Sequence, residues 1–463
     1  MTSSLTLTEV QHAELKRSLF PGDGYESAAI LLCRFNGPTN ERLIVSKIIN
    51  VPDEMCAKRT PKFISWSGQC IEDAIDQAEQ HADAIVLIHS HPGGMFAFST
   101  VDDESDASTI PALFSAIEAD GFHHGSAIMI PDGSMKARLY RSSGGVQSIN
   151  RITRVGHDVI DITKPLSTYV MPFGSKMTKS FAYQTACVIG VSGTGTLVAE
   201  LLSRKGVGHL ILFDFDAMEP KNLNRIVNST TSDAEKNRPK VEMMAAAIKR
   251  YAPHTTVTIV DASIEEREAI IAASAADILF SCVDSMAGRS IVELICQCCV
   301  IPMVDLGVTI PTRKDVEGNT HIADVCGRVD YVRPDGPSLS DRQVVTPEGL
   351  RREYLLRNAP DAAQKEIEAG YIKGVHEEAP SVMALNMRVA GDAVMEWISR
   401  QFGYRHEGNQ PYARTVFSLA GGEVDYDSEA SFSVADKPEL ARGLIEPLLG
   451  IPGLANTELE DAV

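Results

Sequence analysis

A pair of histidines followed by an aspartate has the spacing of a zinc site. His89 and His91 end an apolar, strand-like segment. Side chains two residues apart on a strand lie on the same face, so both imidazoles can reach one metal ion. Asp102 falls in the first turn of a predicted helix that Ser99 or Thr100 would cap. Two imidazoles and one carboxylate leave one position of zinc open, which is typical of a catalytic site. The alternative is that the histidines only line a strand end and that the aspartate only caps a helix.

A hydrolase built on such a site also needs a carboxylate that is not a metal ligand. This group accepts a proton from water, whose pKa zinc lowers, and passes the proton to the leaving amine. Glu26 is the candidate because it stands at the head of the first apolar strand, from which a side chain can point toward a neighbouring strand end. Glu72 and Glu79 also lie upstream, but their place on the polar face of a predicted helix favours simple solvation. Ser99 is the candidate donor to the developing oxyanion.

A glycine-rich turn indicates a second site, for a nucleotide. Gly190, Gly193 and Gly195 follow a strand-like segment at 185–189 and lead into a predicted helix. Such a turn lets phosphate approach the backbone and the helix N-terminus. Asp214 ends the next predicted strand, about 20 residues further on, where a carboxylate can bind ribose hydroxyls. These features alone favour a dinucleotide-binding Rossmann fold.

The residues that follow favour ATP with magnesium instead. Two cations, Arg225 and Lys240, come after Asp214, and a later predicted strand leads to Asp284. The cations would hold the triphosphate and Asp284 the metal ion. A nicotinamide cofactor would need none of these residues.

Strand-like and helix-like segments alternate in residues 1–145, which we expect to form a mixed-sheet α/β domain. Residues 1–20 are expected to form an amphipathic helix. The strand-like segments are 27–35, 42–51, 62–68 and 84–92, with a helix-like segment at 68–83. Residues 146–180 have the glycine, proline and serine content of a linker.

A regular alternation of strands and helices begins at residue 181. Predicted strands lie at 185–190, 209–214, 256–263, 276–284 and 302–307, and predicted helices at 195–206, 239–253, 264–276 and 289–299. This order predicts a Rossmann-like, mostly parallel sheet covered by helices on both faces. We expect this domain to span residues 181–405. An acidic C-terminal extension at 406–463 is expected to be ordered only in part.

Composition places the chain among ordinary globular proteins of two domains. Its 463 residues exceed what one core usually holds. A net charge of -19 disfavours binding to nucleic acid. The absence of a long apolar run and of a signal-peptide pattern predicts a cytoplasmic protein with no membrane span. Nine cysteines without framework spacing are expected to be reduced thiols.

The first constellation resembles the JAB/MPN (JAMM) metalloproteases, over roughly residues 5–142. The pattern of that family is an upstream glutamate, then His-Ser/Thr-His-Pro, and then a serine and an aspartate at a fixed spacing. The matching residues here are Glu26, His89, Ser90, His91, Pro92, Ser99 and Asp102. The resemblance implies zinc-dependent cleavage of isopeptide or peptide bonds after the C-terminal glycine of a ubiquitin-like protein.

The second constellation resembles the ThiF and ubiquitin-activating superfamily, over about residues 180–400. That pattern is a glycine turn, Asp-x-Asp, Asn-Leu-x-Arg, a lysine at the next helix start and an aspartate after a later strand. The resemblance implies adenylation of a C-terminal glycine carboxylate with release of pyrophosphate. The residues implied are Gly190, Gly193 and Gly195 for the phosphates, Asp214 for the ribose, Asp216 beside it, Asn222, Arg225 and Lys240 for the triphosphate, and Asp284 for magnesium, with Arg225 and Lys240 also catalytic.

Three departures from this second pattern bear on function. Ser192 replaces the usual middle glycine, which is tolerated if the backbone there keeps a negative φ. Serines stand at 333–340 where many relatives have Cys-x-x-Cys, so we expect no zinc in this domain. Residues 327–463 contain no cysteine that could carry a thioester. Cys326 is either a nucleophile or a core thiol, and the latter interpretation is favoured.

Two smaller sets of residues leave alternatives open. Cys296, Cys298 and Cys299 form either a metal cluster or, as their apolar neighbours favour, buried structural thiols. Family dimers lend an arginine to the neighbouring active site, and Arg151 and Arg154 are the candidates for it.

Together the resemblances predict a bifunctional enzyme of a bacterial-type ubiquitin-like pathway that uses Zn2+, ATP and Mg2+. The expected partners are a small ubiquitin-like or sulfur-carrier protein with a C-terminal glycine, a conjugating enzyme and a second copy of the chain. One alternative is activation and processing of a sulfur-carrier protein for thiocarboxylate formation. Another is a non-catalytic regulator that only binds a ubiquitin-like protein.

Overall fold

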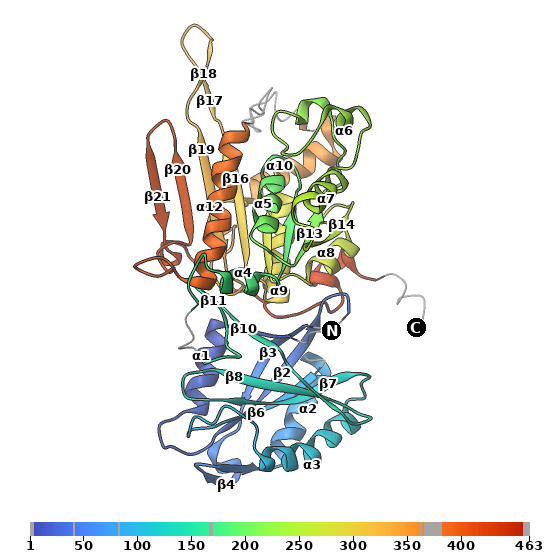
Figure 1. Cartoon of the computed structure of the whole chain (residues 1–463), viewed down its shortest axis with the longest axis vertical. Helices are drawn as coiled ribbons and strands as arrows, with labels where there is room; N and C mark the ends of the chain where they lie inside the picture. Colours follow the sequence, from blue (N-terminus) through green and yellow to red (C-terminus); the bar gives the residue numbers. More distant parts are fainter. Residues whose placement is uncertain are drawn as a thin grey trace. The chain divides into compact units, whose positions relative to one another are not determined.

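The chain forms two compact α/β units (Figure 1). Unit 1 comprises residues 1–169, 297–300 and 438–463, and unit 2 comprises residues 170–296 and 301–437. The computed structural model describes residues 4–39, 42–81, 84–165, 170–361, 363–364 and 382–456. Within these ranges, none of the helices combines the length and the apolar character required to cross a bilayer.

Unit 1 is built on a nine-stranded sheet of order β11-β10-β1-β3-β2-β6-β7-β8-β9. Strand β1 pairs in parallel with β10 and β3, and β6 pairs in parallel with β7. The other neighbours are antiparallel, which confirms the mixed sheet predicted from the sequence. The strands are β1 (Ser4–Thr8), β2 (Ala28–Asn36), β3 (Arg42–Asn50), β6 (Ala84–Ser90), β7 (Phe122–Met129), β8 (Met135–Arg141), β9 (Val146–Ser148), β10 (Arg151–Val155) and β11 (Val159–Asp161).

Helices cover both faces of this sheet, because the alternating side chains of its central strands are apolar on both sides. In β2, Ala29 and Leu31 belong to the core that includes helix α1 (Glu9–Leu19). Ile30 and Leu32, between them, belong to the core that includes helices α2 (Gln69–His81) and α3 (Thr100–Ala116). A separate hairpin of strands β4 (Cys56–Thr60) and β5 (Phe63–Trp66) precedes α2.

The first residues of unit 1 differ from the sequence expectation of one helix. Residues 4–8 form β1, and α1 begins only at Glu9. Thr8 and Gln11 form a capping box, in which each side chain accepts a hydrogen bond from the backbone of the other residue. Since a capping box fixes a helix start, the residues before it are free to pair with β10 and β3.

Residues 146–161 also differ from the expectation, because three short strands lie in this part of the segment assigned to a linker. Strands β9, β10 and β11 all come from it, and β10 pairs with β1 at the far end of the unit's sequence.

Unit 2 contains an eight-stranded sheet of order β14-β13-β12-β15-β16-β19-β20-β21. Strands β12 to β16 pair in parallel, as the βαβ pattern predicted. Strands β19, β20 and β21 extend the sheet with antiparallel pairing. The chain order reverses between β12 and β15, which makes their carboxyl ends the topological switch point where α/β folds bind ligands. The strands are β12 (Thr185–Ile189), β13 (His209–Phe213), β14 (Thr256–Val260), β15 (Ile278–Ser281), β16 (Met303–Thr309), β19 (Cys326–Val332), β20 (Arg414–Ser418) and β21 (Glu423–Asp427).

Helices connect these parallel strands, and α12 packs against α5, β16 and β19 (Figure 1). A second hairpin consists of β17 (Thr312–Lys314) and β18 (Thr320–Ile322). The α-helices are α4 (Ser175–Phe181), α5 (Gly193–Arg204), α6 (Thr231–Glu235), α7 (Lys240–Tyr251), α8 (Arg267–Ala273), α9 (Met286–Cys299), α10 (Pro347–Asn358) and α12 (Met383–Phe402). Short 3-10 helices are η1 (Asp53–Met55), η2 (Pro220–Asn222), η3 (Glu429–Ser431), η4 (Leu448–Gly450) and η5 (Pro452–Leu454).

Part of the expected C-terminal extension belongs to the unit 2 sheet. Strands β20 and β21, at 414–427, pair with β19 and with each other. In β21 the apolar residues Val424 and Tyr426 alternate with acidic ones, but both are exposed, so strand pairing and not burial of one face holds this segment in the sheet.

Candidate functional sites

The three predicted zinc ligands lie together in unit 1. His89 is near the end of β6, His91 follows it, and Asp102 is in the first turn of α3. Their ligand atoms all lie within 4.8 Å of one another, and this is the one such group of His, Cys, Asp and Glu among the described residues. His89 Nε2 is 3.2 Å from one oxygen of Asp102, and His91 Nε2 is 3.5 Å from the other. The donor set is therefore suited to Zn2+.

Hydrogen bonding orients this donor set for a metal. His91 Nδ1 lies 2.8 Å from the carbonyl oxygen of Met95, which can only accept, so Nδ1 carries a proton. Nε2 faces Asp102, to which it donates when the ring is protonated, and its lone pair becomes available to a metal once that second proton is lost. Burial by itself would raise the pKa of Asp102. Hydrogen bonds from His89, His91 and the Ser99 backbone outweigh burial and hold this pKa well below its ordinary value. Asp102 is thus an anion at neutral pH, as a ligand must be.

Ser99 and Asp102 form the capping box that begins α3. The Ser99 N–H donates to the Asp102 carboxylate at 2.5 Å, and the Asp102 N–H donates to Ser99 Oγ at 3.2 Å. Because Ser99 Oγ accepts in this pair, its own hydroxyl proton is left for another acceptor. The box also orients the Asp102 carboxylate from the helix start.

Glu26 lies near the same site, just before strand β2. The antiparallel pairing of β2 with β6 places Ala28 opposite His89, and Glu26 lies two residues before that pair. Its side chain is buried, and burial raises its pKa, an effect that its electrostatic interaction with His89 and His91 opposes. A glutamate of raised pKa beside a metal site suits proton transfer. Glu72 is exposed on α2, and the side chain of Glu79 lies outside the described residues.

The glycine turn of unit 2 lies at the switch point between β12 and β15. Gly190 has a φ of +89°, and a Cβ added there would lie 2.8 Å from the carbonyl oxygen of Cys282, just after β15. A Cβ on Gly195 would lie 1.9 Å from the carbonyl oxygen of Gly190. Both positions therefore require glycine, and the N-terminus of α5 stays open to an anion. Ser192 occupies the N-cap position of α5 with a φ of -110°, which meets the condition for its replacement of glycine.

The predicted Arg225 lies close to this turn, at Gly193, which has no side chain. A Cβ on Gly193 would lie 3.4 Å from the side chain of Arg225 and 2.5 Å from Asn386 Nδ2 of α12. Asn386 is buried, and sequence analysis did not single it out. The available signal was one amide among the apolar residues of α12, at helical spacing from Val389, Ala390 and Ala393.

Lys240, Asp214 and Asp216 form one ionic group. Lys240 Nζ lies 2.6 Å from Asp216 Oδ2 and 3.6 Å from Asp214 Oδ1. Lys240 and Asp214 are both buried, and burial raises the pKa of Asp214 while the Lys240 ammonium opposes that rise. The group places one cation at the carboxyl end of β13, where the phosphates of a nucleotide on α5 could meet it.

Asn222 and Asp284 occupy two further positions. Asn222 is buried, and its Oδ1 accepts from the Glu219 N–H at 3.0 Å, which holds η2 in place. Asp284 is exposed after β15 and lies beside Arg289, which donates to its carbonyl oxygen at 3.3 Å. Arg289 is held in turn by the buried Asp305. The Asp284 carboxylate is therefore presented to solvent near the glycine turn.

Residue Glu353 of α10 was also missed by sequence analysis. Its two carboxylate oxygens accept from the N–H groups of Met286 and Ala287, at 2.7 and 3.0 Å, and so cap α9 just after Asp284. No local sequence signal predicts this contact, because the residues are far apart in the chain.

The remaining candidates lie elsewhere. Arg151 and Arg154 are on β10 in unit 1, where Arg154 pairs with Glu9 at 3.8 Å. Cys296, Cys298 and Cys299 are fully buried on α9. Cys326 begins β19, and burial together with the neighbouring Asp324 raises its pKa to about 11.

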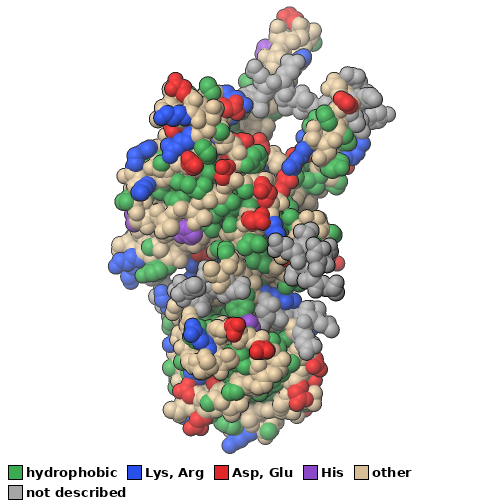
Figure 2. All heavy atoms as spheres, turned by 90° about the vertical axis from the view of Figure 1, so that its right-hand side faces the viewer, with side chains coloured by type: hydrophobic (Ala, Val, Ile, Leu, Met, Phe, Trp, Pro, Cys, Tyr) green, Lys and Arg blue, Asp and Glu red, His purple; other side chains and the backbone are tan. Residues whose placement is uncertain are grey.

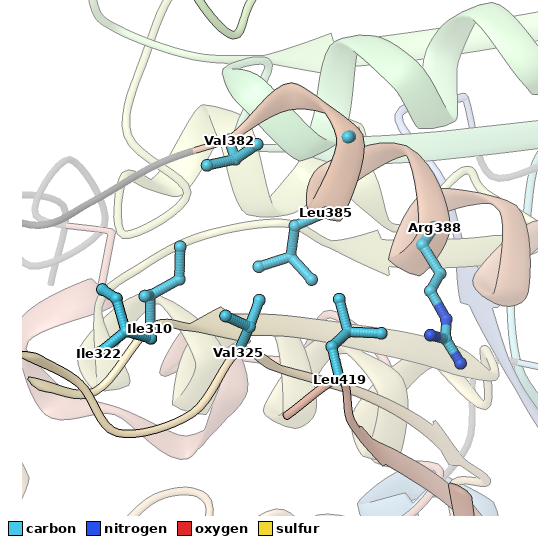
Figure 3. A pocket seen from close by; sticks show the side chains of 8 residues that line it. Ile310, Ile322, Val325, Val382, Leu385, Arg388 and Leu419 are labelled. Carbon is cyan, nitrogen blue, oxygen red and sulfur yellow. The ribbon is translucent and has the colours of Figure 1, made fainter. Parts of the chain in front are cut away.

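An apolar groove lies at the start of α12 in unit 2 (Figure 3). Its volume is about 460 Å³, and its lining is aliphatic except for Arg388. The groove lacks the polar partners that a nucleotide needs. The lining residues are Ile310, Ile322, Val325, Val382, Ala384, Leu385, Arg388 and Leu419.

The surface charges are mixed on the face that Figure 2 shows, where acidic and basic side chains of the described residues are interspersed. A nucleic-acid surface would gather the basic residues into one stripe or patch. This face has no such pattern.

The chain belongs to the ThiF family, whose model matches residues 166–416, more than half of its length. Residues 8–141 match the model for prokaryotic homologues of the JAB domain. The two resemblances seen in the sequence are thereby confirmed, as a JAB-like domain followed by a ThiF domain.

Similar proteins cover only parts of the chain. Molybdopterin-synthase adenylyltransferase of Escherichia coli (strain K12) is 32% identical over 117 residues, which is 25% of this chain and 46% of that protein. Ubiquitin-like modifier-activating enzyme 5 of Drosophila melanogaster is 30% identical over 177 residues, which is 34% of this chain and 43% of that protein. The chain thus spans less than half the length of these relatives. The crystal structure of E. coli MccB with ATP is 15% identical, with a TM-score of 0.41, over 58% of this chain and 68% of that chain.

Proposed function

We propose that this chain is a bifunctional enzyme of a bacterial ubiquitin-like pathway. Unit 2 adenylates the C-terminal glycine of a small ubiquitin-like protein, and unit 1 cleaves peptide or isopeptide bonds that involve that glycine. The main support for this proposal is that one chain contains two chemically distinct sites, the histidine and aspartate group in unit 1 and the glycine turn in unit 2. Both act on a flexible tail that ends in glycine, and their covalent linkage raises the effective concentration of one beside the other.

The adenylation step needs charge neutralisation more than covalent chemistry. An oxygen of the glycine carboxylate attacks the α-phosphorus of ATP, a P–O bond to the β-phosphate breaks, and pyrophosphate leaves. The backbone of the glycine turn and the start of α5 bind the phosphates, and Arg225 and Lys240 neutralise charge that develops on them. Asp214 binds the ribose. Magnesium, when bound by Asp284, would shield the phosphate oxygens.

The hydrolytic step uses Glu26 and Ser99 around the histidine and aspartate ligands. Zinc, when bound by His89, His91 and Asp102, would supply Lewis acidity that makes water nucleophilic near neutral pH. Glu26 accepts the proton of the attacking water and delivers it to the leaving amine nitrogen. The Ser99 hydroxyl donates to the oxygen of the former carbonyl as negative charge develops there.

The apolar groove at the start of α12 is proposed as the contact for the protein substrate near its tail. Leu385 lines the groove, while its neighbour Asn386 lies beside Gly193 of the glycine turn. A tail bound along the groove is thus led toward the nucleotide. Leu419→Asp, in the groove, should raise the KM for the protein substrate about tenfold, a loss of ~1.4 kcal/mol, and leave the KM for ATP unchanged. Val424→Asp, at a similarly exposed position outside the groove, is the control.

Activation of a sulfur-carrier protein is the second candidate, and Cys326 favours it. The raised pKa of Cys326 keeps it a neutral thiol at pH 7, whereas a thioester-forming cysteine needs thiolate character. The adenylate would then be consumed by an external sulfur donor. A covalent adduct sensitive to thiols, formed with the substrate protein and lost in Cys326→Ser, would instead support conjugation.

Two substitutions test the bifunctional proposal. With a small glycine-terminated protein as substrate, Lys240→Ala should abolish ATP-pyrophosphate exchange and leave peptidase activity intact. His91→Ala should have the opposite effect. Loss of both activities in either folded variant would contradict separate sites, and binding of the protein without either reaction would support a non-catalytic regulator.

A further inference from the structure

Strand β8 presents a polar face to the segment that carries Ser99 and Asp102. Met135, Ala137 and Leu139 of β8 are buried in the core. Because side chains alternate along a strand, Lys136, Arg138 and Tyr140 share the opposite face. Two aromatic residues of the segment before α3 stack on these cations. Lys136 Nζ lies 4.8 Å from the ring centroid of Phe96, and Arg138 Cζ lies 3.8 Å from that of Phe98.

The Arg138 guanidinium also holds the first turns of α3. Its Nη1 lies 2.5 Å from Asp103, and its Nη2 and Nε lie 2.7 and 3.0 Å from the same oxygen of Asp106. A planar guanidinium can stack on a ring and donate in a fork at the same time, which a lysine ammonium cannot do. Arg138 thus joins Phe98, just before Ser99, to the two aspartates that follow Asp102 on α3.

Asp106 makes this connection rigid. It is buried, and it also accepts from the Tyr140 hydroxyl at 2.6 Å and from the Ser126 hydroxyl. Ser126 is on β7 and Tyr140 on β8, so the carboxylate is fixed to two neighbouring strands of the sheet. A buried charge held by several hydrogen bonds resists displacement, because each lost contact leaves a desolvated group.

We propose that Arg138 is a positioning residue that sets zinc affinity by fixing how α3 presents Asp102 and Ser99. The inference rests on the proposed zinc function of unit 1. Two ligands come from the end of β6 and the third from α3, so a small rotation of α3 about its axis separates Asp102 from the histidines. Arg138 contacts Phe98, just before α3, and Asp103 and Asp106 within it, so it ties the helix start to the following turn and thereby opposes that rotation.

Zinc affinity of the purified full-length chain, measured by competition with a chromophoric chelator, tests the inference. Arg138→Lys keeps the charge but loses the fork and the stacking, and should bind Zn2+ about tenfold more weakly, as changes to groups that support metal ligands do. Phe98→Leu leaves the buried carboxylate network intact and should shift affinity in the same direction. If Arg138→Lys fails to fold, Phe98→Leu decides the question.

Arg59→Lys is the matched control. Arg59 also pairs with two carboxylates, Asp23 at 2.9 Å and Asp53 at 2.6 Å, and also donates to a segment of the site, the Glu26 carbonyl, at 3.0 Å. That segment carries no metal ligand, so the zinc affinity of Arg59→Lys should match that of the unchanged protein. Thermal unfolding of the metal-free variants verifies that all are folded at the assay temperature.

The outcomes separate the inference from the function on which it rests. If the unchanged protein binds Zn2+ and both Arg138→Lys and Phe98→Leu bind it equally well, the inference is overturned while the zinc site stands. An equal loss in Arg59→Lys overturns it too, because the effect is then general loosening. If the unchanged protein binds no Zn2+, the proposed peptidase function fails and the inference falls with it.

Discussion

At the scale of single residues, a substitution of Glu26 can separate the loss of proton transfer from the loss of metal binding. It lies near His89, His91 and Asp102 but is not part of that candidate ligand group, and its burial favours a proton carrier over a solvated carboxylate. Glu26→Gln should lower kcat of the peptidase roughly 100- to 10,000-fold and leave zinc affinity within about twofold. Steady-state rates combined with chelator competition measure both quantities. A large loss of zinc affinity would show that Glu26 acts as a ligand instead.

Glu293 gives a prediction of pH-dependent stability in unit 2. It is buried on α9, accepts from the Leu339 N–H at 2.7 Å, and burial raises its pKa to about 7. An unfolded chain ionises this group near 4.5, so between about pH 4.5 and 7 the folded state binds more protons and its stability falls as pH rises.

Glu293→Gln should therefore remove part of this pH dependence. The amide keeps an acceptor for Leu339 but does not ionise, so the variant should be more stable than the unchanged protein at pH 8, by roughly 1–3 kcal/mol. Near pH 5 the two should be similar. Urea unfolding at both pH values measures the difference, and a variant that is equally destabilised at both would contradict a buried ionisation.

At the scale of elements, the turn between β12 and α5 has the strictest geometry. A Cβ at Gly195 would overlap the carbonyl oxygen of Gly190, so the turn must open in Gly195→Ala. We expect ATP affinity to fall at least about tenfold, with a stability loss of roughly 1–3 kcal/mol. Calorimetric titration with ATP measures the first effect.

Gly391→Ala on α12 is the control for this turn. An added Cβ meets open space there, and alanine in a helix interior is favoured over glycine by roughly 0.5–1 kcal/mol. The variant should bind ATP normally and unfold at a slightly higher temperature. If both alanine variants bind ATP equally well, the close contact between Gly195 and the Gly190 carbonyl oxygen is not required for ATP binding.

At the scale of the whole molecule, each unit carries one of the chain's two tryptophans. Trp66 is in β5 of unit 1 and Trp397 is in α12 of unit 2. A ligand stabilises the part of the protein that binds it, by about 2.7 kcal/mol at 100 times its Kd. In Trp397→Phe, Zn2+ should raise the unfolding midpoint reported by Trp66, and in Trp66→Phe, ATP should raise that reported by Trp397. If either ligand raises both midpoints, the two units unfold as one.

Local patterns allowed much of this organisation to be predicted from the sequence. A period of two predicted that His89, in β6, and His91, just after it, face the same side, and the capping box at Ser99 and Asp102 is encoded within four residues. The alternation of strands and helices along unit 2 likewise predicted its parallel sheet. These features depend on residues that are close in the sequence, so residue propensities and residue spacing are enough to predict them.

Strand pairing and packing across long sequence separations could only be decided by the tertiary structure. The register of β2 against β6 brings Glu26 to the histidines, while Glu72 stays exposed. Lys240 meets Asp214 and Asp216, and Arg138 meets Asp103 and Asp106, across more than one element. The acidic segment at 414–427 forms strands because β19 offers unpaired backbone groups. Each of these contacts joins residues that are far apart in the sequence. The local sequence around one residue therefore does not predict its partner.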